Sequence, residues 1–202
     1  MNLEIRKYHP SDITSLYKIC LLTSNNGKDI EEFENEPDLL GHLFVGPYVT
    51  FEPELCFVLT NNFKPCGYVL GTKNSEKFYL TAEKKWFPLL RQRYKLPEQN
   101  DKSRMALIKR VLHKGHKPKD KFENHPAHLH IDILPFAQGK GMGKKLMFEF
   151  LNQLKNQKVA GLHLEVGKKN IKAINFYQHI GFTKLKNYEH SIIMGMSLKN
   201  IL

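Results

Sequence analysis

Three glycines recur at alternate positions in the segment Gln138-Gly139-Lys140-Gly141-Met142-Gly143. An apolar, strand-like run ending at Pro135 precedes this segment, and an amphipathic helical pattern beginning near Leu146 follows it. Glycine-rich turns can point main-chain N–H groups outward, and the first N–H groups of a helix have no partner within the helix. Together with the partial positive charge of the helix start, these groups could bind a phosphate. Taken alone, the turn could equally be a tight connection between a strand and a helix.

A second group of polar and aromatic residues lies further along the chain, in the segment Asn170–Tyr177 and the following Gly181-Phe182. A tyrosine phenol has an ordinary pKa of about 10 and can protonate a leaving group such as a thiolate. Tyr177 could therefore act as a general acid. The alternatives are structural, because Asn170 could simply cap a helix and Tyr177 could simply fill the core.

Acidic side chains and histidines occupy the strands around the glycine turn. Asp132 and His130 share one face of the strand before the turn, and Glu165 lies on the next strand. A carboxylate enclosed in a site can have a raised pKa and act as a base, and we prefer Asp132 to Glu165 for that role. Each could instead make a structural hydrogen bond. The spacing of His128 and His130 could suggest a metal, but no third ligand is evident, so we expect none.

Hydrophobic periodicity predicts an α/β fold with a mixed sheet. A helix that begins just after the glycine turn should connect the strand at residues 128–134 to the strand at residues 161–166. Two strands connected in this way are usually parallel, with a right-handed connection. A short apolar segment, residues 39–45, should close at Gly46-Pro47. The predicted strands cover residues 3–8, 55–60, 66–71, 128–134, 161–166, 182–185 and 192–198, and the main helical patterns cover residues 11–21, 78–90, 105–112, 146–154 and 170–180.

Taken together, the glycine turn and the later segment resemble the GNAT superfamily of acyl-CoA-dependent N-acetyltransferases. The family turn, Gln/Arg-x-x-Gly-x-Gly/Ala, is matched by Gln138, Gly141 and Gly143. The family's later Asn…Ala…Phe-Tyr…Gly-Phe pattern is matched by Asn170, Ala173, Phe176, Tyr177, Gly181 and Phe182. The resemblance is strongest over residues 128–198, and the first half agrees only in the order of its elements.

A narrower resemblance is to the acetyltransferase-like C-terminal domain of O-GlcNAcase enzymes and its free-standing bacterial relatives. It rests on Val45–Tyr48, on Cys66–Thr72 and on a helical insertion that carries Trp86 and Pro88. The animal domain has a degraded glycine turn and resembles a pseudo-acetyltransferase, whereas this chain keeps the turn. The resemblance therefore implies a relative that can bind the cofactor, and we do not extend the glycosidase activity to these residues.

The resemblance implies a single GNAT domain over residues 1–202, with a basic helical insertion at about 75–121. It implies a mixed, mostly antiparallel central sheet with a splayed parallel pair and flanking helices. Acetyl-CoA would be the cosubstrate, and the acetyl group would pass directly to a primary amine. A backbone N–H near Leu134 would stabilise the oxyanion, Tyr177 would be the acid, and Asp132 or Glu165 would be the base. The implied cofactor contacts are Ile133, Leu134, Gln138, Gly139, Lys140, Gly141, Met142, Gly143, Lys144, Asn170 and Phe176.

The net charge of +11 is unevenly distributed. Residues 84–121 contain thirteen Lys or Arg and three Asp or Glu, whereas residues 29–38 contain six acidic residues and no basic one. We hypothesise that the acidic stretch attracts a cationic acceptor, and a solvated loop is the alternative. The basic segment, with Trp86, Phe87 and Tyr94, could bind nucleic acid, but aromatic residues at this helical spacing are more often buried.

Two further features of the sequence concern the cellular location of the protein. No apolar run approaches the roughly 18 residues that a membrane span needs, and the N-terminus lacks a secretory signal pattern. The three cysteines, Cys20, Cys56 and Cys66, fit neither a zinc spacing nor a disulfide framework. We therefore expect a cytoplasmic protein that does not contact a membrane.

The sequence leaves two interpretations of the function open. The first is an N-acetyltransferase that uses acetyl-CoA, with a small amine, a protein lysine or a protein N-terminus as acceptor. The second is a module that binds acyl-CoA without turnover or uses the fold as an interaction surface. We do not favour nucleic acid as a partner, and a homodimer is compatible with the sequence.

Overall fold

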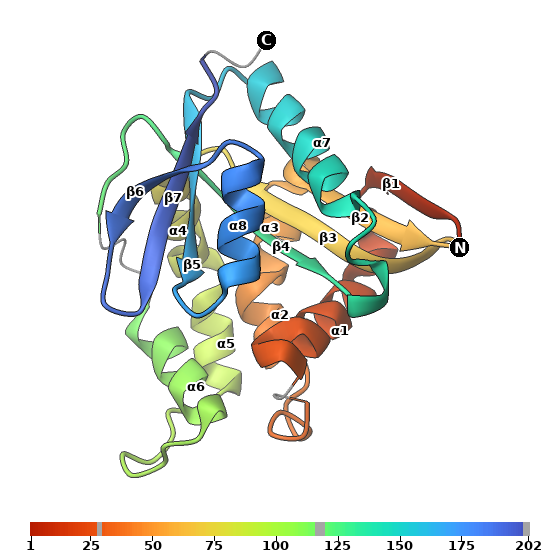
Figure 1. The fold of residues 1–202 in the computed structure, drawn as a ribbon. Helices are drawn as coiled ribbons and strands as arrows, with labels where there is room; N and C mark the ends of the chain where they lie inside the picture. The colour runs from red at the N-terminus through yellow and green to blue at the C-terminus, as the bar shows by residue number, and fades with distance from the viewer. Residues whose placement is uncertain (28–29, 116–119, 200–202) are drawn as a thin grey trace.

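The computed structural model describes residues 1–27, 30–115 and 120–199, so Asp29 of the acidic stretch and residues 116–119 of the predicted insertion lie outside it. In this part of the chain, a 7-stranded sheet has the order β1-β2-β3-β4-β5-β7-β6. Neighbouring strands are antiparallel except for β4 and β5, which are parallel (Figure 1). This arrangement confirms the predicted mixed, mostly antiparallel sheet. The strands are β1 (Leu3–Lys7), β2 (Cys56–Asn61), β3 (Lys64–Thr72), β4 (Ala127–Ile133), β5 (Gly161–Gly167), β6 (Thr183–Asn187) and β7 (Ser191–Ser197).

Helices cover both faces of the sheet and divide the hydrophobic core in two. On one face, the N-terminal helices and the insertion pack around Tyr68 of β3. On the other face, α7 packs across β2 and β3 through Leu146 and Phe150, both fully buried. The helices are α1 (Ile13–Thr23), α2 (Leu39–Phe44), α3 (Gly46–Phe51), α4 (Ser75–Lys85), α5 (Phe87–Arg93), α6 (Arg104–Lys114), α7 (Met142–Asn156) and α8 (Ile171–His179).

One predicted boundary agrees with the structure and one differs. The apolar segment 39–45 closes before Gly46-Pro47 as expected, because α2 ends at Phe44, and a new helix, α3, then begins at Gly46 with Pro47 in its first turn. Proline is tolerated there since the first N–H groups of a helix have no acceptor within it. The continuous pattern predicted over residues 78–90 is divided into α4 and α5 at Trp86, one residue before Phe87-Pro88 opens the second helix.

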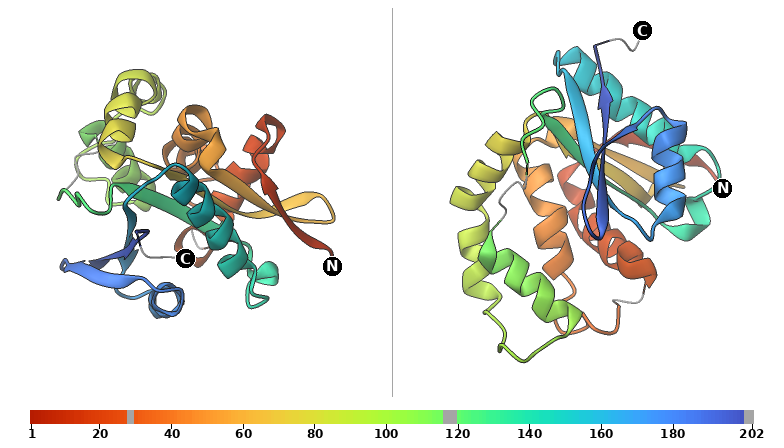
Figure 2. Two further views of the ribbon diagram at one scale, coloured as in Figure 1. Left: turned by 90° about the horizontal axis from the view of Figure 1, so that it is seen from above. Right: turned by 60° about the vertical axis from the view of Figure 1, so that its left-hand side comes forward.

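The insertion between β3 and β4 contains α4, α5 and α6. Figure 2 shows these helices gathered beside α2 and α3 rather than over the centre of the sheet. The indole of Trp86 fixes this contact by donating from Nε1 to the carbonyl of His42 at 2.8 Å. Within the described ranges, no helix combines the length and the apolar composition that a membrane crossing requires.

Candidate functional site

The parallel pair β4–β5 separates along its length. The strands pair only at Ala127↔Leu162 and His128↔His163. Beyond this point β4 continues to pair with β3 as far as Ile133, and β5 continues to pair with β7. One edge of β4 therefore faces β5 without a ladder of hydrogen bonds, and this gap is open toward the end of β4 that leads into the glycine turn.

The free edge of β4 is defined by the alternation of its backbone groups. The N–H of Leu134 donates to the carbonyl of Cys66 at 2.9 Å, so Leu134 faces β3. Antiparallel ladders alternate, and the N–H and C=O groups of Ile131 and Ile133 consequently point toward the gap. Gln138 Nε2 donates to the carbonyl of Ile133 at 2.7 Å. The donor available near Leu134 is thus the N–H of Ile133 rather than that of Leu134 itself.

The glycine turn presents a run of backbone donors. Gly139 and Gly141 have φ angles of 72° and 73°, which L-residues with a Cβ rarely adopt. A Cβ built on either glycine meets no atom within 4 Å, so no side chain fills the space above the turn. The first helical bond is Lys145 N–H to the Gly141 carbonyl at 3.2 Å, and the N–H groups from Gly139 to Lys144 bond to none of the described residues. They form an open anion cradle at the start of a 15-residue helix.

Gly143 has a different role from the two glycines before it. A Cβ on Gly143 would lie 3.3 Å from the ring of Phe176, so the missing side chain lets α8 approach α7 closely. Asn170 caps α8, because its Oδ1 accepts from the N–H of Ala173 at 3.1 Å. The predicted structural role of Asn170 is therefore present, and its amide nitrogen makes no bond to a described residue.

Asp132 lies within a hydrogen-bonded cluster on the helical-insertion face of β4. Its Oδ2 accepts from the hydroxyl of Tyr68 at 2.5 Å and lies 3.3 Å from Nε2 of His130. His130 Nδ1 in turn lies 3.1 Å from the carbonyl oxygen of Phe44. Burial and the neighbouring Asp132 raise the pKa of Tyr68 well above its ordinary value. Tyr68 therefore stays protonated and can donate to Asp132 at every ordinary pH.

Tyr177 lies on α8 and belongs to the core cluster on the α7 side of the sheet. Its side chain is buried against Phe176 and Phe182, and its hydroxyl makes no hydrogen bond with a described residue. Burial, followed by the charge of Asp132, raises the pKa of Tyr177. The phenol therefore remains a proton donor at neutral pH.

Glu165 does not join this pair. It is exposed on β5, and its carboxylate accepts a hydrogen bond from Ser191 of β7. His128 and His130 also serve protein contacts, with Tyr48 and Phe44 as their partners. Among the residues that the structure describes, no three His, Cys, Asp or Glu side chains are grouped so as to hold a metal ion.

The charged segments pair with each other. Lys109 Nζ lies 2.8 Å from a carboxylate oxygen of Glu36, and Glu32 accepts from the N–H of Met105 at the start of α6 at 3.0 Å. Part of the acidic stretch therefore anchors the insertion. We had expected this stretch either to attract a cationic acceptor or to form a solvated loop, and neither expectation included such a contact. Phe87 and Tyr94 are 4% and 2% exposed, so these aromatic rings cannot stack on nucleic-acid bases.

Sequence reasoning did not identify Tyr68 as part of the site. The residue stood in the predicted strand 66–71, but its contact with Asp132 depends on the β3–β4 register, in which these two residues face each other. The alternation of side chains along a strand assigns Tyr68 to one of the two faces of the sheet, but it does not identify the residue that Tyr68 meets on the next strand. Nothing in the sequence specifies the register across the insertion.

Comparison with known proteins agrees with this geometry. A model of the acetyltransferase (GNAT) family matches residues 26–182. Protein O-GlcNAcase of Rattus norvegicus and that of Mus musculus are each 28% identical over 203 residues, covering 96% of this chain and 22% of the relative. The chain thus spans about a fifth of the length of these curated relatives.

Solved structures extend the comparison over nearly the whole chain. The crystal structure of SsHAT is 33% identical with a TM-score of 0.86, covering 99% of this chain and 100% of that one. The PaiA N-acetyltransferase of Thermoplasma acidophilum, solved in complex with coenzyme A, shares the fold at 16% identity, with a TM-score of 0.57 and coverage of 98% and 99%. The glycine turn, the separated parallel strands and these matches lead to one conclusion: the chain belongs to the acetyltransferase (GNAT) family.

Proposed function

We propose that this protein transfers the acetyl group of acetyl-CoA directly to a primary amine. The observation that carries the proposal is the run of N–H groups from Gly139 to Lys144 that bond to no described residue, at the end of the strand β4 whose edge toward β5 is unpaired. Acetyl-CoA, the cosubstrate that fits this family, supplies a pyrophosphate for such donors and an acetyl thioester as the group to be transferred. A structural neighbour has been solved with coenzyme A.

Backbone groups would do most of the binding. The amides from Gly139 to Lys144 bind the pyrophosphate, and the side chains of Lys140 and Lys144 add positive charge at its edge. The N–H and C=O groups of Ile131, which face the gap, pair with an amide of the pantetheine arm as an added strand would, and this leaves the N–H of Ile133 for the reacting carbonyl. Asn170 and Phe176 would contact the arm from α8.

Asp132 and Tyr177 would handle the two proton transfers. Asp132, held by Tyr68 and His130, takes the proton that the attacking amine loses. The N–H of Ile133 stabilises the oxygen of the carbonyl under attack. Tyr177 donates its proton to the sulfur as the carbon–sulfur bond breaks. Each positioned proton transfer is worth about 10²–10⁴ in rate. We assign the base to Asp132 rather than to Glu165, whose carboxylate is bonded to Ser191.

The variant Tyr177→Phe tests the proposal. It should lower kcat by about 10²–10⁴ in an assay of thiol release that depends on added amine, while calorimetry gives an unchanged Kd for acetyl-CoA. Tyr8→Phe, at a half-buried tyrosine of the N-terminal region, is the matched control and should keep full activity. Tight acetyl-CoA binding without amine-dependent thiol release in the unmodified protein would instead identify a module that binds acyl-CoA without turnover.

We further propose that the protein works in a reducing compartment such as the cytoplasm. Its three cysteines are free and buried, and burial raises the pKa of each thiol. Thiols of this kind behave as small apolar side chains and form no disulfides. Fractionation of the source cells, followed by detection of the protein in the soluble reducing fraction, would test this location.

A further inference from the structure

His130 and Asp132 form a pair on the insertion face of β4, and the proposed function uses the imidazole only to hold the carboxylate. Nε2 of His130 lies 3.3 Å from Oδ2 of Asp132. The two side chains are 30% and 22% exposed, so both water and an acceptor can reach them. Oδ1 of Asp132 makes no hydrogen bond with a described residue, and it is the oxygen left to meet an amine.

The backbone of α2 determines which nitrogen of His130 carries the proton. Nδ1 lies 3.1 Å from the carbonyl oxygen of Phe44, and a carbonyl oxygen can only accept a hydrogen bond. Nδ1 is therefore the protonated nitrogen of the neutral ring, and the lone pair of Nε2 faces the Asp132 carboxylate. Two acceptors at this distance repel each other, whereas a proton on Nε2 turns the contact into an ion pair. The geometry thus favours the uptake of one proton at Nε2.

Tyr68 of β3 holds the carboxylate independently of the imidazole. Its hydroxyl donates to Oδ2 of Asp132 at 2.5 Å, and its ring centroid lies 5.5 Å from that of His130. The thiol of Cys20 on α1 interacts with the same hydroxyl, and burial raises the pKa of both groups, so neither ionises near neutral pH. The carboxylate therefore has a fixed neutral donor, and the imidazole is available for another role.

The ionisable groups on the neighbouring strands and helices are bonded elsewhere or neutral. On β5, Glu165 is exposed and bonded to β7, and burial lowers the pKa of His163, so that this ring is neutral at pH 7. On β4, both ring nitrogens of His128 are bonded to hydroxyl groups, and on α8 burial keeps Tyr177 protonated by raising its pKa. No described Lys or Arg forms an ion pair with Asp132.

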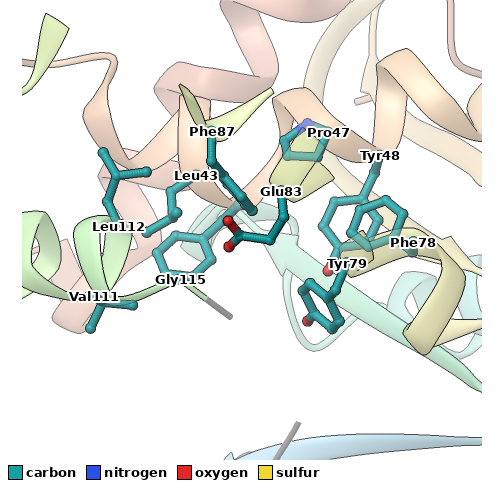
Figure 3. A pocket seen from close by; sticks show the side chains of 11 residues that line it. Leu43, Pro47, Tyr48, Phe78, Tyr79, Glu83, Phe87, Val111, Leu112 and Gly115 are labelled. Carbon is teal, nitrogen blue, oxygen red and sulfur yellow. The ribbon is translucent and has the colours of Figure 1, made fainter. Parts of the chain in front are cut away.

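Phe44 covers the imidazole from α2. Its ring centroid lies 5.9 Å from that of His130, and its carbonyl accepts from the same ring. Phe44 also lines a small pocket between α2, α3 and the insertion, whose walls include neither His130 nor Asp132 (Figure 3). The pair therefore lies outside this pocket, and the exposed part of the imidazole is where a proton can pass to water.

We propose that His130 and Asp132 act as one base, in which Asp132 takes the proton of the acceptor and His130 then holds it. This role rests on the proposed acetyl transfer. As the bond between nitrogen and the acetyl carbon forms, the nitrogen loses its proton to the carboxylate, which passes a proton to Nε2. The carboxylate regains its negative charge, and the imidazolium releases the proton to water. The breaking carbon–sulfur bond leaves its electrons on the sulfur, which takes the proton of Tyr177, and water restores that proton.

The variant His130→Asn separates proton holding from structural support. An asparagine amide can donate to the Phe44 carbonyl as Nδ1 does, but it cannot bind a proton in place of Nε2. At about pH 8, kcat/KM should fall about tenfold or more, as a part of the 10²–10⁴ that a positioned proton transfer contributes. The ratio of the two rates should approach one as the pH falls below about 6.5, where imidazoles ordinarily become protonated. Ionisation of the amine cancels in this ratio, and a ratio independent of pH overturns the proposal.

A double-variant cycle tests whether the two side chains act as a unit. Asp132→Asn should lower kcat/KM by about 10²–10⁴, and adding His130→Asn should cause almost no further loss. Losses that multiply would contradict the pair. His113→Asn is the matched control, because His113 is a half-buried histidine whose ring also bonds a backbone carbonyl, that of Tyr94 at 2.7 Å. It should leave the rate and its pH profile unchanged.

NMR spectroscopy of isotope-labelled imidazoles tests the pair without acetyl transfer. The neutral ring of His130 should be the Nδ1–H tautomer, and the Nε2–H signal of the charged ring should be shifted downfield by a carboxylate contact that Asp132→Asn removes. If both signatures are present but no thiol is released from acetyl-CoA with added amine, acetyl transfer fails and the pair stands. If thiol is released but the Nε2–H signal is the same in Asp132→Asn, acetyl transfer stands and the pair fails.

Discussion

Replacing Gly141 by alanine should weaken acetyl-CoA binding and destabilise the fold by separable amounts. The φ angle of 73° costs an L-residue roughly 1–2 kcal/mol. For a chain of this size, each 1 kcal/mol lowers Tm by about 2–4 °C. The new methyl group would project into the open space above the turn and displace a phosphate from the N–H groups. Loss of one charge-assisted hydrogen bond, about 1.5–3 kcal/mol, raises Kd by roughly 10–100-fold.

Two other glycines provide matched controls for this prediction. Gly181 has a φ of 102° and lies at the end of α8, so Gly181→Ala should lower Tm without changing the Kd for acetyl-CoA. Gly167 has open space for a Cβ and no positive φ, so Gly167→Ala should change neither quantity. Thermal unfolding and calorimetry measure the two effects. An unchanged Kd in Gly141→Ala, or an equal rise in Gly181→Ala, would refute the assignment of the cradle.

Three further changes test the fold and its electrostatics. Burial alone would raise the pKa of Asp12, but the Arg6 guanidinium, at 2.7 Å, more than offsets this and holds it below the ordinary value. Asp12→Asn should therefore cost about 1.5–3 kcal/mol in urea unfolding at pH 7, and the difference from the unmodified protein should shrink as pH falls below about 4. Gly71→Ala places a Cβ 2.3 Å from an aromatic ring of α7 and 2.6 Å from a β4 carbonyl, and should lower the free energy of unfolding by about 1–3 kcal/mol. Glu36→Gln weakens the ion pair with Lys109 of α6 and should lower the free energy of unfolding by about 1 kcal/mol. Glu34→Gln, at an exposed site, should change it by less than about 0.5 kcal/mol. Equal Tm values for the two variants would contradict the anchoring role.

Features that depend on neighbouring residues could be predicted from the sequence. The glycine turn, the helix after it and the cap at Asn170 follow from local backbone requirements, and the structure contains all three. Alternation along β4 placed His130 and Asp132 on one face, which is also observed. The break at Trp86 was missed because apolar spacing continues through it, although Pro88 favours a new helix start at that point.

Features that join distant segments could not be predicted in this way. The contact of Tyr68 with Asp132 requires the register of β3 against β4. The pairing of Glu36 with Lys109 and the pocket wall shared by Phe44 and Val111 require the insertion to return to α2. Charge counting identified two oppositely charged segments, but it could not show that they meet.

The insertion also affects how the chain can fold. β3 and β4 are neighbours in the sheet, yet residues 73–126 separate them in the sequence. Closing a loop of this length costs about 3 kcal/mol more conformational entropy than closing a two-residue turn. The β2–β3 hairpin should therefore form early, and the pairing of β4, which creates the free edge, should come late and slow the overall rate. Stopped-flow measurements on a variant with the inserted helices shortened should show faster folding.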